Sequence, residues 1–402
     1  MKTIIILGDG MADEPVEALG GKTPLQAARK PYIDMLAKMG RNGLLSTVPE
    51  GFQPGSEIAN LSVLGYNVAE VFEGRGSLEA ASMGVSIQKG EMVMRCNLLT
   101  IEKGLIKNHS AGHITTEEAT VLINFLQEKL GDDKVTFYPG VSYRHLLKIK
   151  GGNKNLKCTP PHDVPGTPFR DVMVKALKPE AEATADLINE LTIKSQALLA
   201  SHPINLKRIS EGKQPANSIW AWSPGYKPQM KTLKELYGIG SGAVISAVDL
   251  IKGIGVYAGL EPINVKGATG LYDTNYEGKA EAAIEALKKN DFVYLHIEAS
   301  DEAGHEGDCA LKTKTIEYLD SRIVKPIYEA VKEWNEPVTI AILPDHPTPC
   351  RIKTHTKAPV PFLIYIPGNE ADSVEAYDEF AAAKGSYGTL YGDEFIKELF
   401  SK

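Results

Sequence analysis

The stretch Ile4-Ile5-Ile6-Leu7-Gly8-Asp9-Gly10 sets four apolar residues directly before a carboxylate that lies between two glycines. Two later stretches repeat the arrangement: Phe292–Ile297 precedes Asp301, and Thr339–Leu343 precedes Asp345. Short continuous apolar runs bounded by Gly or Pro are typical of strands buried in a parallel sheet. Because ligands bind beyond the carboxyl ends of such strands, we expect the three acids to lie at one edge of one sheet.

Three histidines accompany these acids. His305 follows Asp301 by one helical turn, His346 directly follows Asp345, and His355 lies one loop further on. Each pair alone has an ordinary explanation as a helix cap or a turn residue. Together they supply more oxygen and nitrogen ligands than one ion needs, so the sequence predicts a two-metal site.

The composition is that of an ordinary globular protein. The 402 residues are 43% hydrophobic and 24% charged, and they suffice for two or three domains. A net charge of −7 argues against nucleic acid as a partner. The absence of a long apolar run or a leader-like segment predicts a cytoplasmic protein without a membrane partner. The cysteines show no paired spacing and predict neither a disulfide framework nor a thiolate metal site: Cys96, Cys158, Cys309 and Cys350.

The expected metal residues also divide the chain, because all of them except Asp9 follow residue 300. The long middle has its own helix and strand signals, at 115–130 and 180–199 for helices and at 135–138 and 144–149 for strands. We therefore predict an α/β fold with a mostly parallel sheet flanked by helices, formed by residues 1-69 and 221-402. A smaller α+β domain, residues 70-220, is inserted into it.

Ser56 opens an apolar-periodic stretch that ends at Gly65. The plain interpretation is a helix N-cap. A catalytic role is compatible with it, because a serine there feels the positive end of the helix dipole and a nearby metal lowers its hydroxyl pKa. Such a serine can attack phosphorus without a histidine base.

The inserted segment carries groups suited to an anionic substrate, although each alone is commonly a solvated surface charge. These are Arg75, Arg95, Asn97, Arg144, His145, Lys148, Arg170 and Lys175. Residues 108–113 lead into the helix expected at Thr115, a natural anion site. A proline-stiffened loop at 158–163 adds an acid and an imidazole. His202 and His296 have no such context, and we expect structural roles for them.

The assembled motifs resemble the cofactor-independent phosphoglycerate mutases, in the archaeal-type branch of the alkaline-phosphatase-like superfamily. The likeness covers nearly the whole chain and rests on residues 8–11, 54–57, 61–66, 110–114, 142–145, 160–163, 273–279, 301–305 and 345–349. Two positions depart from the better-known bacterial members. Asn60 stands where a histidine would be, and Pro160-Pro161-His162-Asp163 replaces an expected Arg-Asp pair. These departures leave open the donor of the leaving-group proton and the substrate specificity.

The resemblance implies two divalent cations, Mn²⁺ or Mg²⁺ with Zn²⁺ as a further alternative, and no 2,3-bisphosphoglycerate. One ion would take Asp301, His305 and His355; the other would take Asp9, Ser56, Asp345 and His346. Ser56 would become phosphoserine, and Lys279 would neutralise phosphoryl charge. In the inserted domain, the implied proton shuttle is Asp163 with His162, and the implied substrate-binding residues are His113, Arg144, His145 and Arg75.

The expected function is interconversion of 3-phosphoglycerate and 2-phosphoglycerate in glycolysis and gluconeogenesis. Two alternatives stay open at this point. One is a related metal-dependent phosphotransferase that acts on another hydroxy acid such as homoserine. The other is a non-catalytic protein that binds phosphometabolites on the same fold. The expected partner is a small phosphorylated hydroxy acid, and the sequence does not indicate the oligomeric state.

Overall fold

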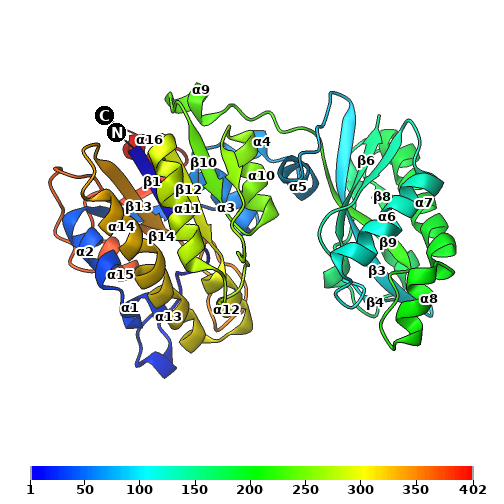
Figure 1. Cartoon of the computed structure of the whole chain (residues 1–402), viewed down its shortest axis with the longest axis horizontal. Coiled ribbons are helices and arrows are strands. Elements are labelled where there is room, and N and C mark those ends of the chain that lie inside the picture. The colour runs from blue at the N-terminus through cyan, green and yellow to red at the C-terminus, as the bar shows by residue number, and fades with distance from the viewer. Residues whose placement is uncertain (1, 401–402) are drawn as a thin grey trace. The chain divides into compact units, whose positions relative to one another are not determined.

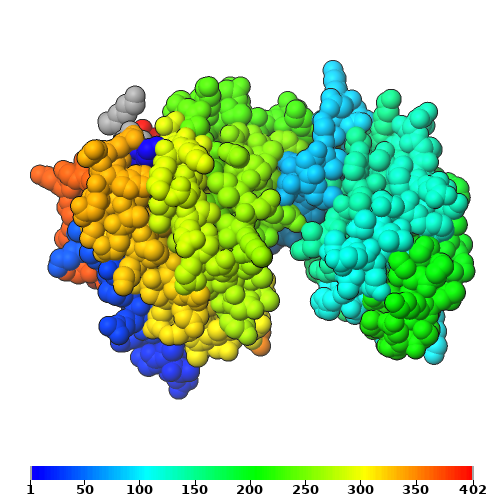
Figure 2. All heavy atoms as spheres, in the orientation of Figure 1, coloured from blue at the N-terminus to red at the C-terminus, as the bar shows by residue number. Residues whose placement is uncertain are grey.

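The computed structural model describes residues 2–400 and divides into two compact units. Unit 1 comprises Met1–Phe72 and Gln229–Lys402, and unit 2 is Glu73–Pro228 (Figure 1). Figure 2 shows the same discontinuity in space, since blue N-terminal atoms lie among the yellow and orange atoms of the C-terminal half. The boundary expected after residue 220 falls inside strand β9 (Ser218–Gly225), which pairs with β3 in unit 2.

Unit 1 is built on an eight-stranded sheet with the order β11-β10-β12-β1-β13-β14-β2-β15. Its strands are β1 (Lys2–Gly8), β2 (Arg41–Ser46), β10 (Gly242–Ile245), β11 (Glu261–Ile263), β12 (Phe292–Ile297), β13 (Val338–Leu343), β14 (Val360–Tyr365) and β15 (Thr389–Tyr391). The three apolar runs are the neighbouring parallel strands β12, β1 and β13. Only β14 runs antiparallel to its neighbours. The predicted α/β fold with a mostly parallel sheet is confirmed.

Helices cover both faces of this sheet (Figure 1). They are α1 (Pro24–Ala27), α2 (Pro31–Met39), α3 (Ser56–Val63), α4 (Val68–Val71), α9 (Leu233–Tyr237), α10 (Asp249–Tyr257), α11 (Tyr276–Lys289), α12 (Ala299–Glu306), α13 (Cys309–Tyr318), α14 (Lys325–Val331), α15 (Glu379–Ala382) and α16 (Glu394–Phe400). One core joins β1, β12 and β13 to α2, α11 and α14. On the other face, the Phe395 ring of α16 lies 5.1 Å from the Phe362 ring of β14. None of the described helices is long and apolar enough to cross a membrane.

Unit 2 is a five-stranded antiparallel sheet with helices packed on it. The strands are β3 (Glu91–Glu102), β4 (Leu105–Asn108), β5 (Val135–Tyr138), β6 (Arg144–Lys150) and β9; the helices are α5 (Arg75–Ser82), α6 (Thr116–Leu130), α7 (Glu182–Ala200) and α8 (Pro203–Ser210). Thr115 caps α6 by accepting a bond from the Glu118 backbone amide. The Glu118 carboxylate pairs with Arg208.

Lys312 connects two loops that support the carboxyl edge of the large sheet. Its side chain is completely buried on α13. The ammonium donates to Asp13 Oδ2 at 2.8 Å, to the Ala12 carbonyl at 3.0 Å and to the Thr348 carbonyl at 2.9 Å. The loop after β1 and the loop after β13 are therefore held by one buried cation.

Replacing Lys312 by Met should destabilise the fold strongly, because the buried Asp13 carboxylate loses its counter-charge. Removing one partner of a buried pair typically costs about 3–5 kcal/mol. Lys314→Met is the matched control, since that lysine forms an exposed pair with Glu317 on the same helix and such pairs contribute about 0–1 kcal/mol. Urea denaturation of both variants measures the free energies of unfolding. A similar loss in the two would contradict the role of Lys312.

Candidate metal centre

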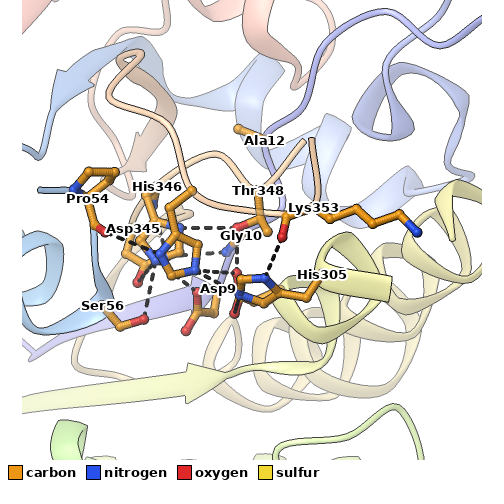
Figure 3. Close-up of polar contacts among 12 residues, drawn as sticks. Asp9, Gly10, Ala12, Pro54, Ser56, His305, Asp345, His346, Thr348 and Lys353 are labelled. Carbon is orange, nitrogen blue, oxygen red and sulfur yellow. Dashed lines mark hydrogen bonds and ion pairs between the residues drawn. The ribbon is translucent and has the colours of Figure 1, made fainter. Parts of the chain in front are cut away.

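Three acids meet at the carboxyl edge of β1, β12 and β13, as the strand pattern predicts. Asp9 directly follows β1, Asp301 lies in the first turn of α12 after β12, and Asp345 follows β13. All three are buried, with exposed fractions of 1%, 4% and 0%. Figure 3 shows Asp9, Asp345, His305, His346 and Ser56 turned toward one another.

Asp301 lies between two histidines. Its Oδ2 is 3.2 Å from His305 Nε2, and its Oδ1 is 3.3 Å from His355 Nε2. The two Nε2 atoms are 3.0 Å apart. His305 Nδ1 lies 3.0 Å from the Lys353 carbonyl oxygen, which accepts a hydrogen bond from it. The other ring nitrogen, Nε2, therefore faces the cluster. Two imidazole nitrogens converging on one carboxylate form a ready set of ligands for a divalent cation.

His346 joins this group to a second one. Its Nε2 lies 3.7 Å from Asp9 Oδ1, 3.4 Å from Asp345 Oδ2 and 3.2 Å from Ser56 Oγ. Ligand atoms of Asp9, Asp345 and His346 lie within 4.8 Å of one another, as do those of Asp301, His346 and His355. All seven residues expected to be metal ligands therefore lie together in unit 1.

The protein alone compensates only part of the negative charge of this cluster. Burial, together with the Asp345 and Asp301 charges, raises the pKa of Asp9 well above its usual value. Among the described residues, Asp9 Oδ1 is buried without a hydrogen-bond partner. Burial would also raise the pKa of Asp301, but hydrogen bonds with His305 and His355 outweigh it and lower that pKa. An orphaned, desolvated oxygen within an oxygen and imidazole donor set fits a divalent cation.

Ser56 is the first residue of α3, and the N-cap is Gly55, with φ −171° and ψ 154°. The expectation that Ser56 is the N-cap is therefore wrong by one position. The Ser56 hydroxyl lies 3.2 Å from His346 Nε2. Ser56 therefore still lies at the positive end of the helix dipole, and its hydroxyl oxygen faces the acids and histidines.

Several neighbours orient the acids, and the sequence reasoning missed most of them. His296, expected to be structural, places Nε2 2.9 Å from Asp9 Oδ2. Thr348 Oγ1 donates to Asp301 Oδ1 at 2.5 Å, and Asn60 Nδ2 donates to Asp345 Oδ2 at 2.9 Å. Such second-layer bonds fix the orientation of metal ligands. The position of His296 beside Asp9 follows only from the register that pairs Leu7 with His296.

Lys279 and Glu298 extend the cluster. Lys279 is fully buried on α11, and burial lowers its pKa to about 8. Burial and the charges of Glu302 and Asp301 raise the pKa of Glu298 to about 8. Ligand atoms of Asp9, Glu298 and Asp301 also lie within 4.8 Å of one another, so Glu298 is a further acidic group that the sequence did not single out.

In unit 2, the expected substrate residues gather around two aromatic rings. The His162 ring is 5.4 Å from Trp222, and the His113 ring is 6.5 Å from Tyr143. The Arg144 guanidinium lies 5.7 Å from the Tyr143 ring centroid. The side chains of His162 and Asp163 are about half exposed, and His162 Nε2 lies 3.5 Å from Asp163 Oδ1. Arg75 lies close enough for its charge to act on His162.

His145 lies apart from this group. It is 1% exposed, and its Nδ1 accepts a bond from the Gly140 amide at 3.0 Å. Burial lowers its pKa to about 3, so it is a neutral core residue. Its position in the core of unit 2 does not agree with the expected contact to substrate.

Fold and site together define an α/β enzyme whose buried acids and histidines are arranged for divalent cations beside a serine. A family model described as 2,3-bisphosphoglycerate-independent phosphoglycerate mutase matches residues 37–205. The enzyme of that name from Methanosarcina acetivorans is 53% identical over 403 residues, covering 99% of each chain. The chain belongs to the 2,3-bisphosphoglycerate-independent phosphoglycerate mutase family, as its motifs predicted.

Two solved structures agree. A Pyrococcus horikoshii protein matches with a TM-score of 0.83 and 30% identity, covering 100% of this chain and 98% of the other. The cofactor-independent phosphoglycerate mutase from Thermoplasma acidophilum matches with a TM-score of 0.69 and 26% identity, covering 99% of each chain.

Binding of Mn²⁺ should strengthen as pH rises and should release protons. The hydrogen bond between His305 and Asp301 raises the pKa of His305 to about 9, so this imidazole holds a proton that a cation must displace. The raised pKa of Asp9 acts in the same direction. Calorimetric titration at about pH 6 and about pH 8, each in two buffers of different ionisation enthalpy, measures affinity and proton release. Asp301→Ala should abolish tight binding, whereas the exposed Glu306→Ala should not. Affinity independent of pH, with no proton released, would contradict the cluster as a metal site.

Proposed function

We propose that this chain interconverts 3-phosphoglycerate and 2-phosphoglycerate through a phosphoserine on Ser56, without 2,3-bisphosphoglycerate. The observation that carries the proposal is the Ser56 hydroxyl, which lies at the start of α3 and 3.2 Å from His346 Nε2 among the buried acids. The full-length similarity to enzymes with this name supports the substrate. The reaction is a step of glycolysis and gluconeogenesis, which supports a cytoplasmic location.

We propose two cations in the cluster, Mn²⁺ or Mg²⁺, with Zn²⁺ as the alternative. Asp301, His305 and His355 would hold one of them. Asp9, Ser56, Asp345 and His346 would hold the other. When bound, they would supply Lewis acidity that lowers the pKa of the Ser56 hydroxyl and neutralises phosphoryl oxygens.

The protein's own groups divide the remaining work. Ser56 Oγ attacks phosphorus, and the glycerate oxygen leaves on the opposite side, so the P–O bond to substrate breaks as the bond to serine forms. The Lys279 ammonium neutralises the phosphoryl oxygens. Asp163, with His162 beside it, gives a proton to the leaving glycerate oxygen and later takes one from the other hydroxyl. The oxygen of that hydroxyl then attacks the phosphoserine, and the bond between phosphorus and Ser56 Oγ breaks as the new P–O bond forms.

Unit 2 supplies the groups that hold the glycerate carboxylate. Arg144, Arg75 and His113 are the proposed contacts. Ala111 and His113 both have left-handed backbones, with φ of 49° and 53°. Such conformations cost of order 1–3 kcal/mol each and gather at ligand sites, which supports this loop as part of the site. His145 is assigned to holding the Gly140 turn.

An assay coupled to enolase tests the reaction. With 3-phosphoglycerate and Mn²⁺ but no 2,3-bisphosphoglycerate, enolase should receive 2-phosphoglycerate. Excess chelator should abolish turnover and added Mn²⁺ should restore it. Full activity of metal-stripped protein would rule out the proposed route. Transfer to homoserine with no mutase activity would favour the alternative acceptor.

Ser56→Ala should abolish transfer with little loss of stability. Losing the nucleophile stops the covalent route, whereas the first-turn hydroxyl contributes less than about 1 kcal/mol to stability. Mass spectrometry of quenched wild-type enzyme should find phosphate on Ser56. Ser62→Ala, on the same helix, is the matched control and should keep activity. Reproducible phosphate on another residue would exclude Ser56 as nucleophile.

Arg144→Ala and Asp163→Ala should lower mutase flux and raise the ratio of released phosphate to 2-phosphoglycerate. A weakly held glycerate leaves before the phosphoryl group returns, and water then attacks the phosphoserine. Metal content should stay unchanged, because the cluster lies in unit 1. Lys194→Ala, an exposed residue of α7, serves as control. A parallel loss of mutase and hydrolysis would show that the two residues assist phosphoryl transfer itself.

A further inference from the structure

Three polar side chains lie in a row along the carboxyl edge of the large sheet. Ser246 follows β10, His296 is the last residue but one of β12, and Asp9 follows β1. These strands are neighbours in the order β10-β12-β1, and the parallel register pairs Ile245 with Leu295. The pairing of the strands therefore brings together three residues that are far apart in the sequence.

The Ser246 side chain connects the His296 ring to the backbone. Its Oγ lies 3.1 Å from His296 Nδ1 and accepts a hydrogen bond from the Val248 amide at 2.9 Å. The other ring nitrogen, His296 Nε2, lies 2.9 Å from Asp9 Oδ2. The exposed fractions of Ser246, His296 and Asp9 are 4%, 0% and 1%, so little water competes for these contacts.

The contacts of Ser246 decide on which nitrogen of His296 the ring proton lies. The hydroxyl has one proton to donate, and His296 Nδ1 is its only acceptor among the described residues, since the Val248 amide itself donates. Complete burial favours a neutral imidazole, which has one protonated nitrogen. Because Nδ1 accepts from Ser246, the ring proton lies on Nε2 and is donated to Asp9 Oδ2.

The direction of this bond determines what Asp9 offers to a cation. Its Oδ2 accepts from the ring, whereas its Oδ1 is buried without a hydrogen-bond partner among the described residues and lies 3.7 Å from His346 Nε2. With the ring proton on Nδ1 instead, the bond to Asp9 would need a proton on the carboxyl group itself. A metal ligand must give up that proton, so the second tautomer opposes metal binding.

We propose that Ser246 is a positioning residue of the metal centre. Its hydroxyl holds His296 in the Nε2–H tautomer, and the ring in turn holds the Asp9 carboxylate ionised, with Oδ1 free for the cation. Ser246 acts through His296 and does not touch the ion. The inference rests on the proposed cation site and not on the reaction proposed there.

NMR spectroscopy of the ring nitrogens in the isotope-labelled, metal-free full chain tests the tautomer. The His296 signals are identified by their absence from His296→Asn. The wild-type ring should have a protonated Nε2 and an unprotonated Nδ1. In Ser246→Ala, a substantial share of the rings should carry the proton on Nδ1. A wild-type ring with Nδ1 protonated, or an unchanged spectrum in Ser246→Ala, would overturn the proposal.

Ser195→Ala is the matched control, because Ser195 is also a buried serine whose Oγ accepts from a backbone amide, that of Ile219 at 3.0 Å. It lies on α7 in unit 2 and does not contact the metal cluster. Both variants lose a buried hydroxyl, so both should unfold at a lower temperature. Only Ser246→Ala should change the His296 spectrum.

Calorimetric titration with Mn²⁺ supplies the second measurement. Ser246→Ala should weaken the ion that Asp9 holds roughly tenfold, the lower end of the effect typical for residues behind metal ligands. The ion held by Asp301 should keep its affinity, and Ser195→Ala should leave both unchanged. Wild-type Mn²⁺ affinity in Ser246→Ala, or equal weakening in Ser195→Ala, would show a purely structural serine and overturn the proposal. A wild-type chain that binds no Mn²⁺ would refute the cation site itself, and the ring spectrum distinguishes that failure from a wrong tautomer.

Discussion

Burial of like charge at one edge of a sheet is the constraint that organises unit 1. Ligand atoms of Asp9 lie within 4.8 Å of those of Asp301 and of those of Asp345, and all three acids are almost completely removed from water. Burial and the repulsion between like charges in a low-dielectric interior raise the pKa of Asp9 well above its usual value. Divalent cations reverse the sign of the interaction. Metal binding and the stability of this edge are therefore linked.

The surrounding structure holds the acids in place against that repulsion. Each one accepts from a fixed neighbour: Asp9 from His296, Asp301 from Thr348, and Asp345 from Asn60. Behind these contacts, Lys312 ties the loops that follow β1 and β13. Such contacts fix the orientation of the three carboxylates. The groups proposed to hold substrate belong to unit 2.

Features that depend on a local sequence pattern could be predicted from the sequence. Features that depend on how strands pair, and on which side of a strand a residue faces, could not. Apolar runs followed by acids revealed the three central strands and their shared edge. The role of His296 requires the pairing of β1 with β12, which no local pattern contains. The assignment of His145 ignored the period of two in a strand, because Arg144 and His145 are adjacent in β6 and must face opposite sides. The offset at Ser56 arose because a glycine in an extended conformation can itself begin a helix.

Asn60 bears on how the proposed reaction moves protons. Its amide donates to the Ser56 carbonyl at 2.8 Å and to Asp345 at 2.9 Å, while its oxygen accepts from the Tyr294 hydroxyl at 2.5 Å. The side chain is completely buried, and an amide does not titrate. It can orient Asp345 and the first turn of α3, but it cannot give a proton to a leaving alcohol. Asn60 thus has a structural role, which supports the proposal that the His162–Asp163 pair of unit 2 moves the proton.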